Sequence, residues 1–359
     1  MIFNKTESSL NVNATGFQIL GVDISNNYTP LGTTTNLKHP GVSFQNGGTD
    51  ISQLFELNLI RGNTASYTAN IVSDGIILIV TSDGDITFNF PVNNMGLYMK
   101  AGGGGGGRGA NARPGGGGGA GGSAKSEGIG ITNVKQITCT IGNGGGSSTS
   151  GGNTIVTIIN TDNTSYNYTV FGGGAGGLGN SAAANGGSGG GGGGTATVGN
   201  GAGGSVIVGS GTITLISNNT GFAGHYGSTQ TGGGGGGDNS SAPNSKNGTN
   251  GDSFAISGIN FLFGGGGGGG GYRIEPVGSA TAIYAPGTGG TGAGNGGNYN
   301  GVGVNATYLT NNTFGGGGGG GGYNNRLIDD DDSYAGGNGA KGVVIIYLKN
   351  SMMTSTAVV

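Results

Sequence analysis

The chain has 359 residues and a formal net charge of −3 at pH 7, with 13 basic and 16 acidic side chains. So small a charge provides no basic surface for DNA or RNA, which excludes nucleic acid as an expected partner. All but ten of its 94 glycines lie after residue 100, but they are clustered, and the chain has only seven prolines. Collagen is therefore excluded, because its triple helix needs glycine at every third position and abundant proline. The scarcity of charge also argues against a disordered chain.

The first 99 residues have the pattern of an ordinary β domain. Apolar and polar residues alternate over 17–24, 54–60 and 86–92, and residues 76–80 form a continuous apolar run. Alternation is typical of half-buried strands, and a short apolar run is typical of a buried one. We expect an all-β, sandwich-like attachment domain over residues 1–99, with no helices.

After Lys100 the composition changes to long, pure glycine runs. They cover residues 102–107, 115–119, 189–194, 232–237, 264–271 and 315–322. A flexible linker is the simpler alternative, but such linkers are usually diluted with serine, threonine or charge. The backbone N–H and C=O groups of a glycine run need hydrogen-bond partners. Threefold helices that lie side by side provide them by bonding to one another. We expect a bundle of polyglycine II helices, each rising about 3.1 Å per residue.

Short β-branched segments alternate with the glycine runs. They cover residues 131–141, 154–159, 166–171, 205–208, 212–216, 254–256 and 343–347. Their length and their Gly, Asn, Ser or Thr borders predict strands. The expected fold is thus a sandwich-like β domain (1–99), then a glycine-rich polyglycine II bundle with interleaved strands and essentially no α-helix (100–348), then a tail (349–359).

Two octaglycine phrases form an internal repeat, at residues 263–272 and 314–323. Each consists of eight glycines between two aromatic residues, and each is followed by a further tyrosine. Slippage in a low-complexity coding sequence is the alternative origin, but slippage alone would not maintain the spacing of the aromatics. We expect two rods with ends anchored in an apolar layer. The terminal glycines of these rods are Gly264, Gly271, Gly315 and Gly322.

Polar segments that contain aromatic residues lie between the runs, at 218–230, 238–252, 272–286 and 323–334. Loops at one end of a rigid scaffold often carry binding sites, and Tyr, Ser and Asn are favoured in binding loops. Seven side chains in these segments are candidate receptor contacts: Phe222, His225, Tyr226, Tyr272, Tyr284, Tyr323 and Tyr334.

Apparent matches to catalytic motifs in this chain result from its high glycine content. Ser188 has the Gly-x-Ser-x-Gly spacing of a nucleophile elbow, but no strand precedes it and no helix follows it. His39 and His225 have no Cys, Asp or Glu at metal-ligand spacing, so each is expected to be a loop residue. We therefore expect neither an enzyme nor a cofactor.

One acidic run offers a weak candidate for a metal site. Four adjacent carboxylates could gather Ca²⁺, although a solvated acidic loop fits them better because no EF-hand spacing is present. These residues are Asp329, Asp330, Asp331 and Asp332. Cys139 is the only cysteine, so no intrachain disulfide is expected. The polar start of the chain predicts no signal peptide, and no apolar run approaches the length needed for membrane insertion.

Residues 136–146, the octaglycine phrases and residues 335–347 resemble the glycine-rich distal domains of bacteriophage tail-fibre adhesins. The Gly-Gly-Asn-Gly cluster that leads into a Val-Val-Ile-Ile-Tyr strand is similar to the usual end of such domains. The resemblance covers about residues 100–348. In T-even-like phages it implies an N-terminal attachment domain, then a layered polyglycine II bundle whose loops bind a bacterial outer-membrane protein. Similar domains occur in large DNA viruses, where the implied role is capsid decoration.

The expected function is that of a viral protein on the virion surface, a tail-fibre or fibre-tip adhesin for host recognition. Residues 1–99 would bind a virion or fibre protein, and the loops of the bundle would bind a host receptor. The alternative is a self-assembling structural protein, such as capsid decoration or a filament subunit. A homo-oligomer, either a trimer or a filament, is compatible with the composition. Ice binding would need a regular threonine face, and the threonines are scattered.

Overall fold

The computed structural model describes residues 60–194, 204–205, 209–213, 217–219, 221–228, 230–238, 246–274, 281–308, 310–325 and 332–349, and four short strands before residue 60. In this part of the chain the regular secondary structure is strand, apart from a 3₁₀ turn, η1 (Thr310–Asn312). The prediction of an all-β fold is confirmed. The four short strands form two hairpins: β1 (Gln18–Ile19) with β2 (Val22–Asp23), and β3 (Lys38–His39) with β4 (Val42–Ser43).

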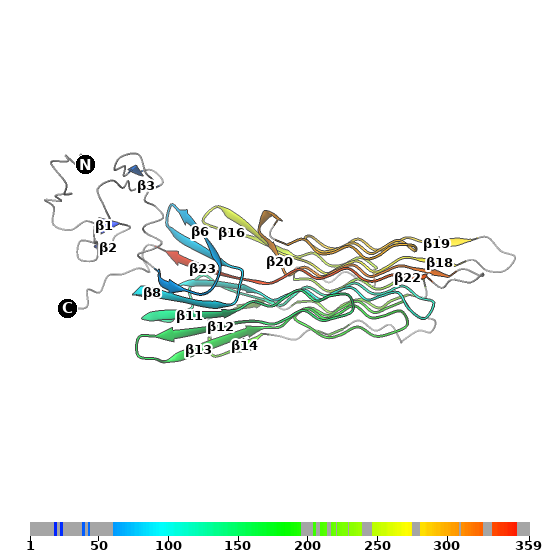
Figure 1. Cartoon of the computed structure of the whole chain (residues 1–359), viewed down its shortest axis with the longest axis horizontal. Helices are drawn as coiled ribbons and strands as arrows, with labels where there is room; N and C mark the ends of the chain where they lie inside the picture. Colours follow the sequence, from blue (N-terminus) through cyan, green and yellow to red (C-terminus); the bar gives the residue numbers. More distant parts are fainter. Residues whose placement is uncertain are drawn as a thin grey trace.

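Two six-stranded antiparallel sheets form a sandwich at one end of the molecule (Figure 1). The first sheet has the order β15 (Ser217–Asn219), β10 (Ser123–Ser126), β9 (Gly96–Lys100), β23 (Val343–Lys349), β7 (Gly75–Val80) and β6 (Tyr67–Val72). The second has the order β14 (Ser210–Gly211), β13 (Ser165–Val170), β12 (Thr154–Asn160), β11 (Val134–Thr140), β8 (Gly84–Val92) and β5 (Ile60–Asn63). Most predicted strands are therefore present, whereas Thr212 and Ile213 lie outside any strand.

The sandwich core lies between the two sheets. Along β12 every second residue is buried, which is the pattern of a strand with one face on a core. Leu78 and Ile346 of the first sheet belong to the same buried cluster as Ile137 and Val156 of the second. Burying one such side chain contributes roughly 1.5–3 kcal/mol, so this cluster holds the two sheets together.

Strands from both sides of residue 100 share the first sheet. β23, the last strand of the chain, lies between β7 and β9 and pairs antiparallel with both. The predicted boundary between residues 99 and 100 falls inside β9, one residue before that strand ends at Lys100. After residue 100 the chain returns to the two sandwich sheets several times, among others at β10, β11 and β23.

Two smaller sheets lie at opposite ends of the octaglycine stretches. Near the sandwich, β16 (Asp252–Ile256), β17 (Ile259–Phe263) and β20 (Thr313–Phe314) form a three-stranded sheet. At the far end of the elongated molecule, which we call the distal end, a four-stranded sheet has the order β19 (Ala282–Tyr284), β18 (Tyr272–Ile274), β21 (Tyr323–Asn325) and β22 (Asp332–Ser333) (Figure 1).

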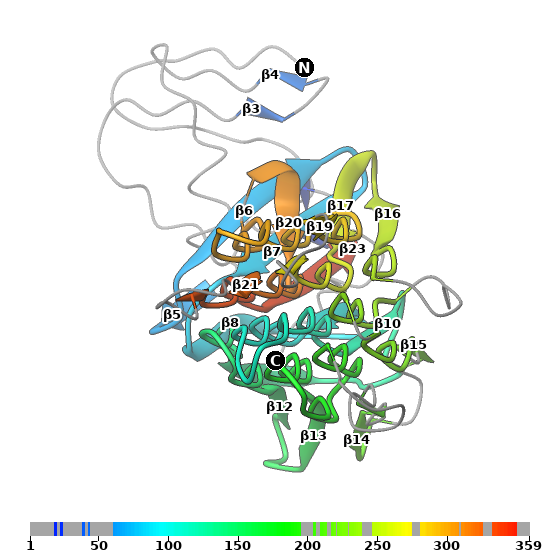
Figure 2. The same ribbon diagram turned by 90° about the vertical axis from the view of Figure 1, so that its right-hand side faces the viewer.

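The glycine runs connect these ends as extended segments that bond to one another (Figures 1 and 2). Residues 115–122 show the arrangement most completely. Their N–H groups bond to three neighbouring segments, at 315–321, 171–177 and 233–236. Their carbonyls accept from three further segments, at 101–107, 188–191 and 267–270. This segment is therefore surrounded by six others.

These bonds repeat with a period of three residues. Toward one antiparallel neighbour the donors are three apart: Gly115 bonds to Gly321 at 2.9 Å, Gly118 to Gly318 at 2.8 Å and Gly121 to Gly315 at 2.9 Å. Viewed along their length, the segments are narrow coils lying beside one another in rows (Figure 2). A period of three means that successive residues face three different neighbours, which explains how one segment bonds to six.

Glycine is required here because the segments approach so closely. A Cβ built on Gly103 would lie 2.0 Å from the carbonyl oxygen of Gly316, and one on Gly106 would lie 2.0 Å from that of Gly319. Real Cβ atoms essentially never come within 3.0 Å of another heavy atom. The requirement is spatial, since the runs avoid the left-handed region except at Gly315, with φ of +65°. Buried, hydrogen-bonded glycines of this kind do not fit a flexible linker.

The aromatic residues hold the two octaglycine stretches in parallel register. Phe263 pairs with Phe314 at the sandwich side, and Tyr272 pairs with Tyr323 at the distal end. All four side chains are buried. Gly264 donates to the carbonyl of Phe314 at 2.7 Å, while Gly271, Gly315 and Gly322 also donate to backbone carbonyls. The expected anchoring of each rod by its terminal aromatics is thus present.

The buried Cys139 gives a test of the sandwich. Its thiol is 1 % exposed in β11, and burial, with smaller contributions from Asp85 and Asp83, raises its pKa from 9.0 to about 12. We expect thiol reagents at pH 8 to label the folded chain far more slowly than a free cysteine, with full labelling on unfolding in urea. Because the folded pKa is raised, this group contributes stability below pH 9 that is lost as the pH rises toward 12. Rapid labelling of the native chain would contradict the packed core.

Candidate functional site

Three predicted contact residues lie on residues 221–228, which form one segment of the bundle. The sequence predicted a connecting loop here, and the structure corrects this. The N–H of His225 bonds to the carbonyl of Gly234 at 2.8 Å, and that of Phe222 bonds to Gly237 at 2.9 Å. The reason is the spacing of Gly221, Gly224 and Gly227, which places a glycine at each third position, where the segment faces its neighbours. Glycine at every third residue is the signal that could have revealed it.

Because of this spacing, the side chains of the segment differ in how exposed they are. Tyr226 is 63 % exposed, Phe222 is half-buried, and His225 is buried with its Nε2 lacking a hydrogen-bond partner among the described residues. Burial lowers the pKa of His225, which favours its neutral form. Of these three side chains, Tyr226 is the one with a large surface available to a partner.

The four other candidates gather at the distal sheet. The ring of Tyr272 lies 6.4 Å from that of Tyr284 and 6.3 Å from that of Tyr323, measured between centroids. The guanidinium of Arg113 lies 5.3 Å from the centre of the Tyr272 ring. Tyr334 bonds through its backbone N–H to Gly322. Tyr272 and Tyr323 are buried, so their rings fasten the rods, while Tyr284 and Tyr334 are half-buried.

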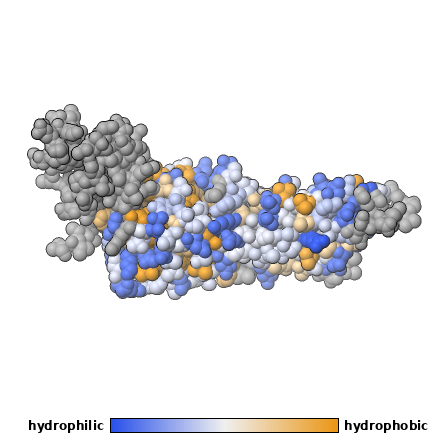
Figure 3. Space-filling view, viewed as in Figure 1, coloured by the Kyte–Doolittle hydropathy of each residue, from blue (hydrophilic) through white to orange (hydrophobic). Residues whose placement is uncertain are grey.

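Large apolar side chains are exposed along the glycine-rich part. Besides Tyr226, those of the described residues are Leu178, Ile283, Val302 and Val304. Ile283 lies in β19 at the distal end, and Val302 follows a turn whose Gly301 bonds to Gly322, the last glycine of its run. Isolated apolar patches stand among polar ones on the surface in Figure 3. The four aliphatic residues were not predicted as contacts, because single aliphatic residues among glycines form no recognisable sequence pattern.

The acidic run is described only in part. Asp332 lies in β22, and Asp329, Asp330 and Asp331 fall outside the described residues. No group of three or more His, Cys, Asp or Glu side chains in the described part of the chain is placed to hold a metal ion. Ser188 is buried in the bundle, where its hydroxyl donates to the carbonyl of Gly237 at 3.3 Å.

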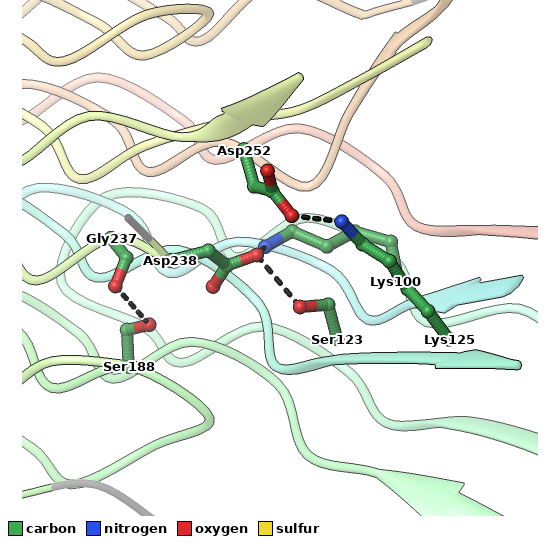
Figure 4. Close-up of polar contacts among 7 residues, drawn as sticks. All are labelled: Lys100, Ser123, Lys125, Ser188, Gly237, Asp238 and Asp252. Atoms are coloured by element: carbon green, nitrogen blue, oxygen red, sulfur yellow. Dashed lines mark hydrogen bonds and ion pairs between the residues drawn. The ribbon is translucent and has the colours of Figure 1, made fainter. Parts of the chain in front are cut away.

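A cluster of charges lies buried where the sandwich meets the bundle (Figure 4). Lys100 forms an ion pair with Asp238, and both side chains are completely buried. The hydroxyl of Ser123 donates to Oδ2 of Asp238 at 2.9 Å. Close by, Lys125 pairs with Asp252, with side chains 19 % and 22 % exposed, and its ammonium lies 4.3 Å from the centre of the Phe254 ring. The sequence showed no sign of this cluster, because its members come from distant segments.

The fold defines an all-β protein in which glycine segments extend from a sandwich. A family model described as "Glycine-rich domain" matches residues 81–349, and the chain belongs to this family. The match begins within the predicted N-terminal unit and ends with β23, so it spans both the sandwich and the bundle. A comparison with curated proteins gives no match. Within the described residues, no helix has the length and apolarity to cross a bilayer.

Proposed function

We propose that the chain is a virion-surface protein, a tail-fibre or fibre-tip adhesin, in which the sandwich end attaches to a virion or fibre protein and the bundle presents a host-binding surface. The observation that carries this proposal is the contrast between the inside and the outside of the bundle. Inside, close backbone contact leaves no room for a Cβ at the glycine positions of the runs, whereas outside, apolar side chains such as Tyr226 and Ile283 are exposed. Exposed aromatic and aliphatic side chains are typical anchors of binding surfaces.

We further infer that the glycine segments are polyglycine II helices. Hydrogen bonds with a period of three, between segments without internal bonds, support this assignment. Such a bundle is stiff, because each helix is fixed on up to six sides. A stiff spacer would hold the contact residues at a constant distance from the sandwich, as receptor binding far from a particle surface requires.

The adhesin proposal is tested by adsorption of the labelled full-length chain to a panel of Gram-negative bacteria. We expect saturable binding to at least one strain. The triple variant Tyr226→Ser, Ile283→Ser and Val302→Ser should weaken it at least tenfold, since removing a single anchor typically costs more than about 1 kcal/mol. The matched control is Val304→Ser. Val304 is nearly as exposed as Val302, at 51 % against 61 %. Its backbone, however, bonds to Gly319 in the middle of a glycine run, so Val304 lies away from the distal end.

Two results would contradict the adhesin. Unchanged binding by the triple variant would remove these side chains as contacts. Absence of binding together with filaments of the pure chain in electron microscopy would favour the self-assembling structural protein instead. In that case sheet edges such as β6, which pairs with β7 in the described part of the chain, would join neighbouring copies.

A further inference from the structure

The ion pair between Lys100 and Asp238 lies where the sandwich meets the glycine bundle. Lys100 is the last residue of β9, and Asp238 follows the glycine run at 232–237. The two residues are 138 positions apart in the chain, and their side chains meet with no exposed surface. A link between them would tie the sandwich directly to a segment of the bundle (Figure 4).

The surroundings favour the uncharged form of Lys100. Burial lowers the pKa of Lys100, although the charge and hydrogen bond of Asp238 oppose the shift. The Phe263 ring centre lies 5.7 Å from the ammonium, so one side of the pair is apolar. Moving a proton from the ammonium to the carboxylate leaves a neutral amine beside a carboxylic acid, which costs less in a low-dielectric site than in water. A desolvated lysine amine is a nucleophile.

The two oxygens of Asp238 differ in their contacts. Oδ2 accepts the hydroxyl hydrogen of Ser123 at 2.9 Å, whereas Oδ1 is buried without a hydrogen-bond partner among the described residues. An unsatisfied buried oxygen is costly, since it forgoes its hydration without compensation. Its loss as water would relieve that cost, while Oδ2 would remain held by Ser123.

We propose that Lys100 and Asp238 form an intramolecular isopeptide bond. After the proton transfer, Nζ of Lys100 attacks Cγ of Asp238, and a bond forms between these two atoms. In the tetrahedral intermediate the proton that Oδ2 received from the ammonium passes to Oδ1, the bond from Cγ to Oδ1 breaks, and Oδ1 leaves as water with this hydrogen and one from the amine. The product is a secondary amide, nothing is oxidised or reduced, and no further reactant is needed.

Two neighbours assist this reaction. Ser123 donates to Oδ2, where negative charge develops in the tetrahedral intermediate, as donors of an oxyanion hole do. The positive charge of Lys125 interacts with that of Lys100, and this repulsion favours the neutral amine that attacks. Lys125 itself pairs with Asp252 where water reaches both side chains, so that pair stays ionic.

The test is the intact mass of the denatured full-length chain. We expect a mass below that of the sequence by one water, and a proteolytic fragment that joins the peptides containing residues 100 and 238. In Lys100→Arg the water loss should vanish, and in Asp238→Asn the mass should fall by one ammonia instead, which shows reaction even if the fold is weakened. Lys125→Arg should retain the water loss, and Ser123→Ala should slow the reaction.

Two outcomes would overturn the isopeptide bond. The first is a wild-type chain at its full sequence mass, which would show that the pair remains ionic. The second is a water loss that persists in Lys100→Arg or that maps to Lys125 and Asp252. Neither outcome bears on host binding, because the mass is measured on the isolated chain.

Discussion

Replacing Gly118 with alanine is expected to destabilise the protein by about 3 kcal/mol, the upper range for inserting a methyl group into a well-packed interior. Its new Cβ would lie 2.1 Å from the carbonyl oxygen of Gly104. The backbone at residue 118 cannot move away easily, because its N–H bonds to Gly318 and its carbonyl accepts from Gly267, each at 2.8 Å. The loss is measured as the free energy of unfolding in urea.

Gly62→Ala is the matched control for this substitution. Gly62 lies in β5, and a Cβ built there has nothing within 4 Å. The alanine should stabilise the chain slightly, by about 0.5–1 kcal/mol, because glycine pays more backbone entropy in a strand. Equal effects of the two substitutions would show that glycine in the runs is there for its conformational freedom, which would contradict close contact between rods.

Lys100→Met is expected to destabilise the protein by about 3–5 kcal/mol, the usual cost of removing one partner of a buried pair, and it also prevents the proposed amide bond. The substitution leaves the carboxyl of Asp238 buried, with Ser123 as its remaining donor among the described residues. Thermal or urea unfolding at pH 7 measures this loss.

Lys125→Met is the control for the buried pair. Its partner Asp252 is 22 % exposed and keeps access to water, so the expected loss is about 1 kcal/mol. The double variant Lys100→Met and Asp238→Leu should be more stable than Lys100→Met alone, since it removes the buried carboxylate as well. If Lys100→Met cost no more than Lys125→Met, the buried pair would have no special role in stability.

The octaglycine phrases were predictable because their pattern is local. Eight glycines between aromatics required close neighbours on every side, and the structure aligns Phe263 with Phe314 and Tyr272 with Tyr323. Strands such as β12 were predictable for the same reason, since alternation in 154–159 marks one buried face. In both cases the residues that carry the signal are consecutive.

Long-range pairing was not predictable from such patterns. Nothing in residues 343–349 indicates that β23 lies between β7 and β9, because any apolar strand could occupy that place. The pairing of Lys100 with Asp238 likewise has no local sign. Segments on the outside of the bundle were missed, since they need glycine only at positions that face a neighbour, as at Gly221, Gly224 and Gly227.

The candidate site was predicted only in part, because composition alone does not distinguish an anchor from a contact. Tyr272 and Tyr323 border glycine runs, and this position buries them between rods. Tyr226 comes from a segment whose side chains alternate between the bundle and solvent, and it is exposed. In this chain the aromatics that adjoin the octaglycine runs are buried, whereas Tyr226, which lies between spaced glycines, is exposed.

Hydrogen–deuterium exchange of the octaglycine amides tests the central claim most directly. Residues 264–271, 315 and 317–322 donate their N–H groups to neighbouring backbone within the bundle. If the glycine runs form a hydrogen-bonded bundle, these amides exchange as slowly as those of β23 in the sandwich. Exchange at the rate of an unstructured peptide, while β23 stays protected, would show that the runs are linkers and would contradict the account.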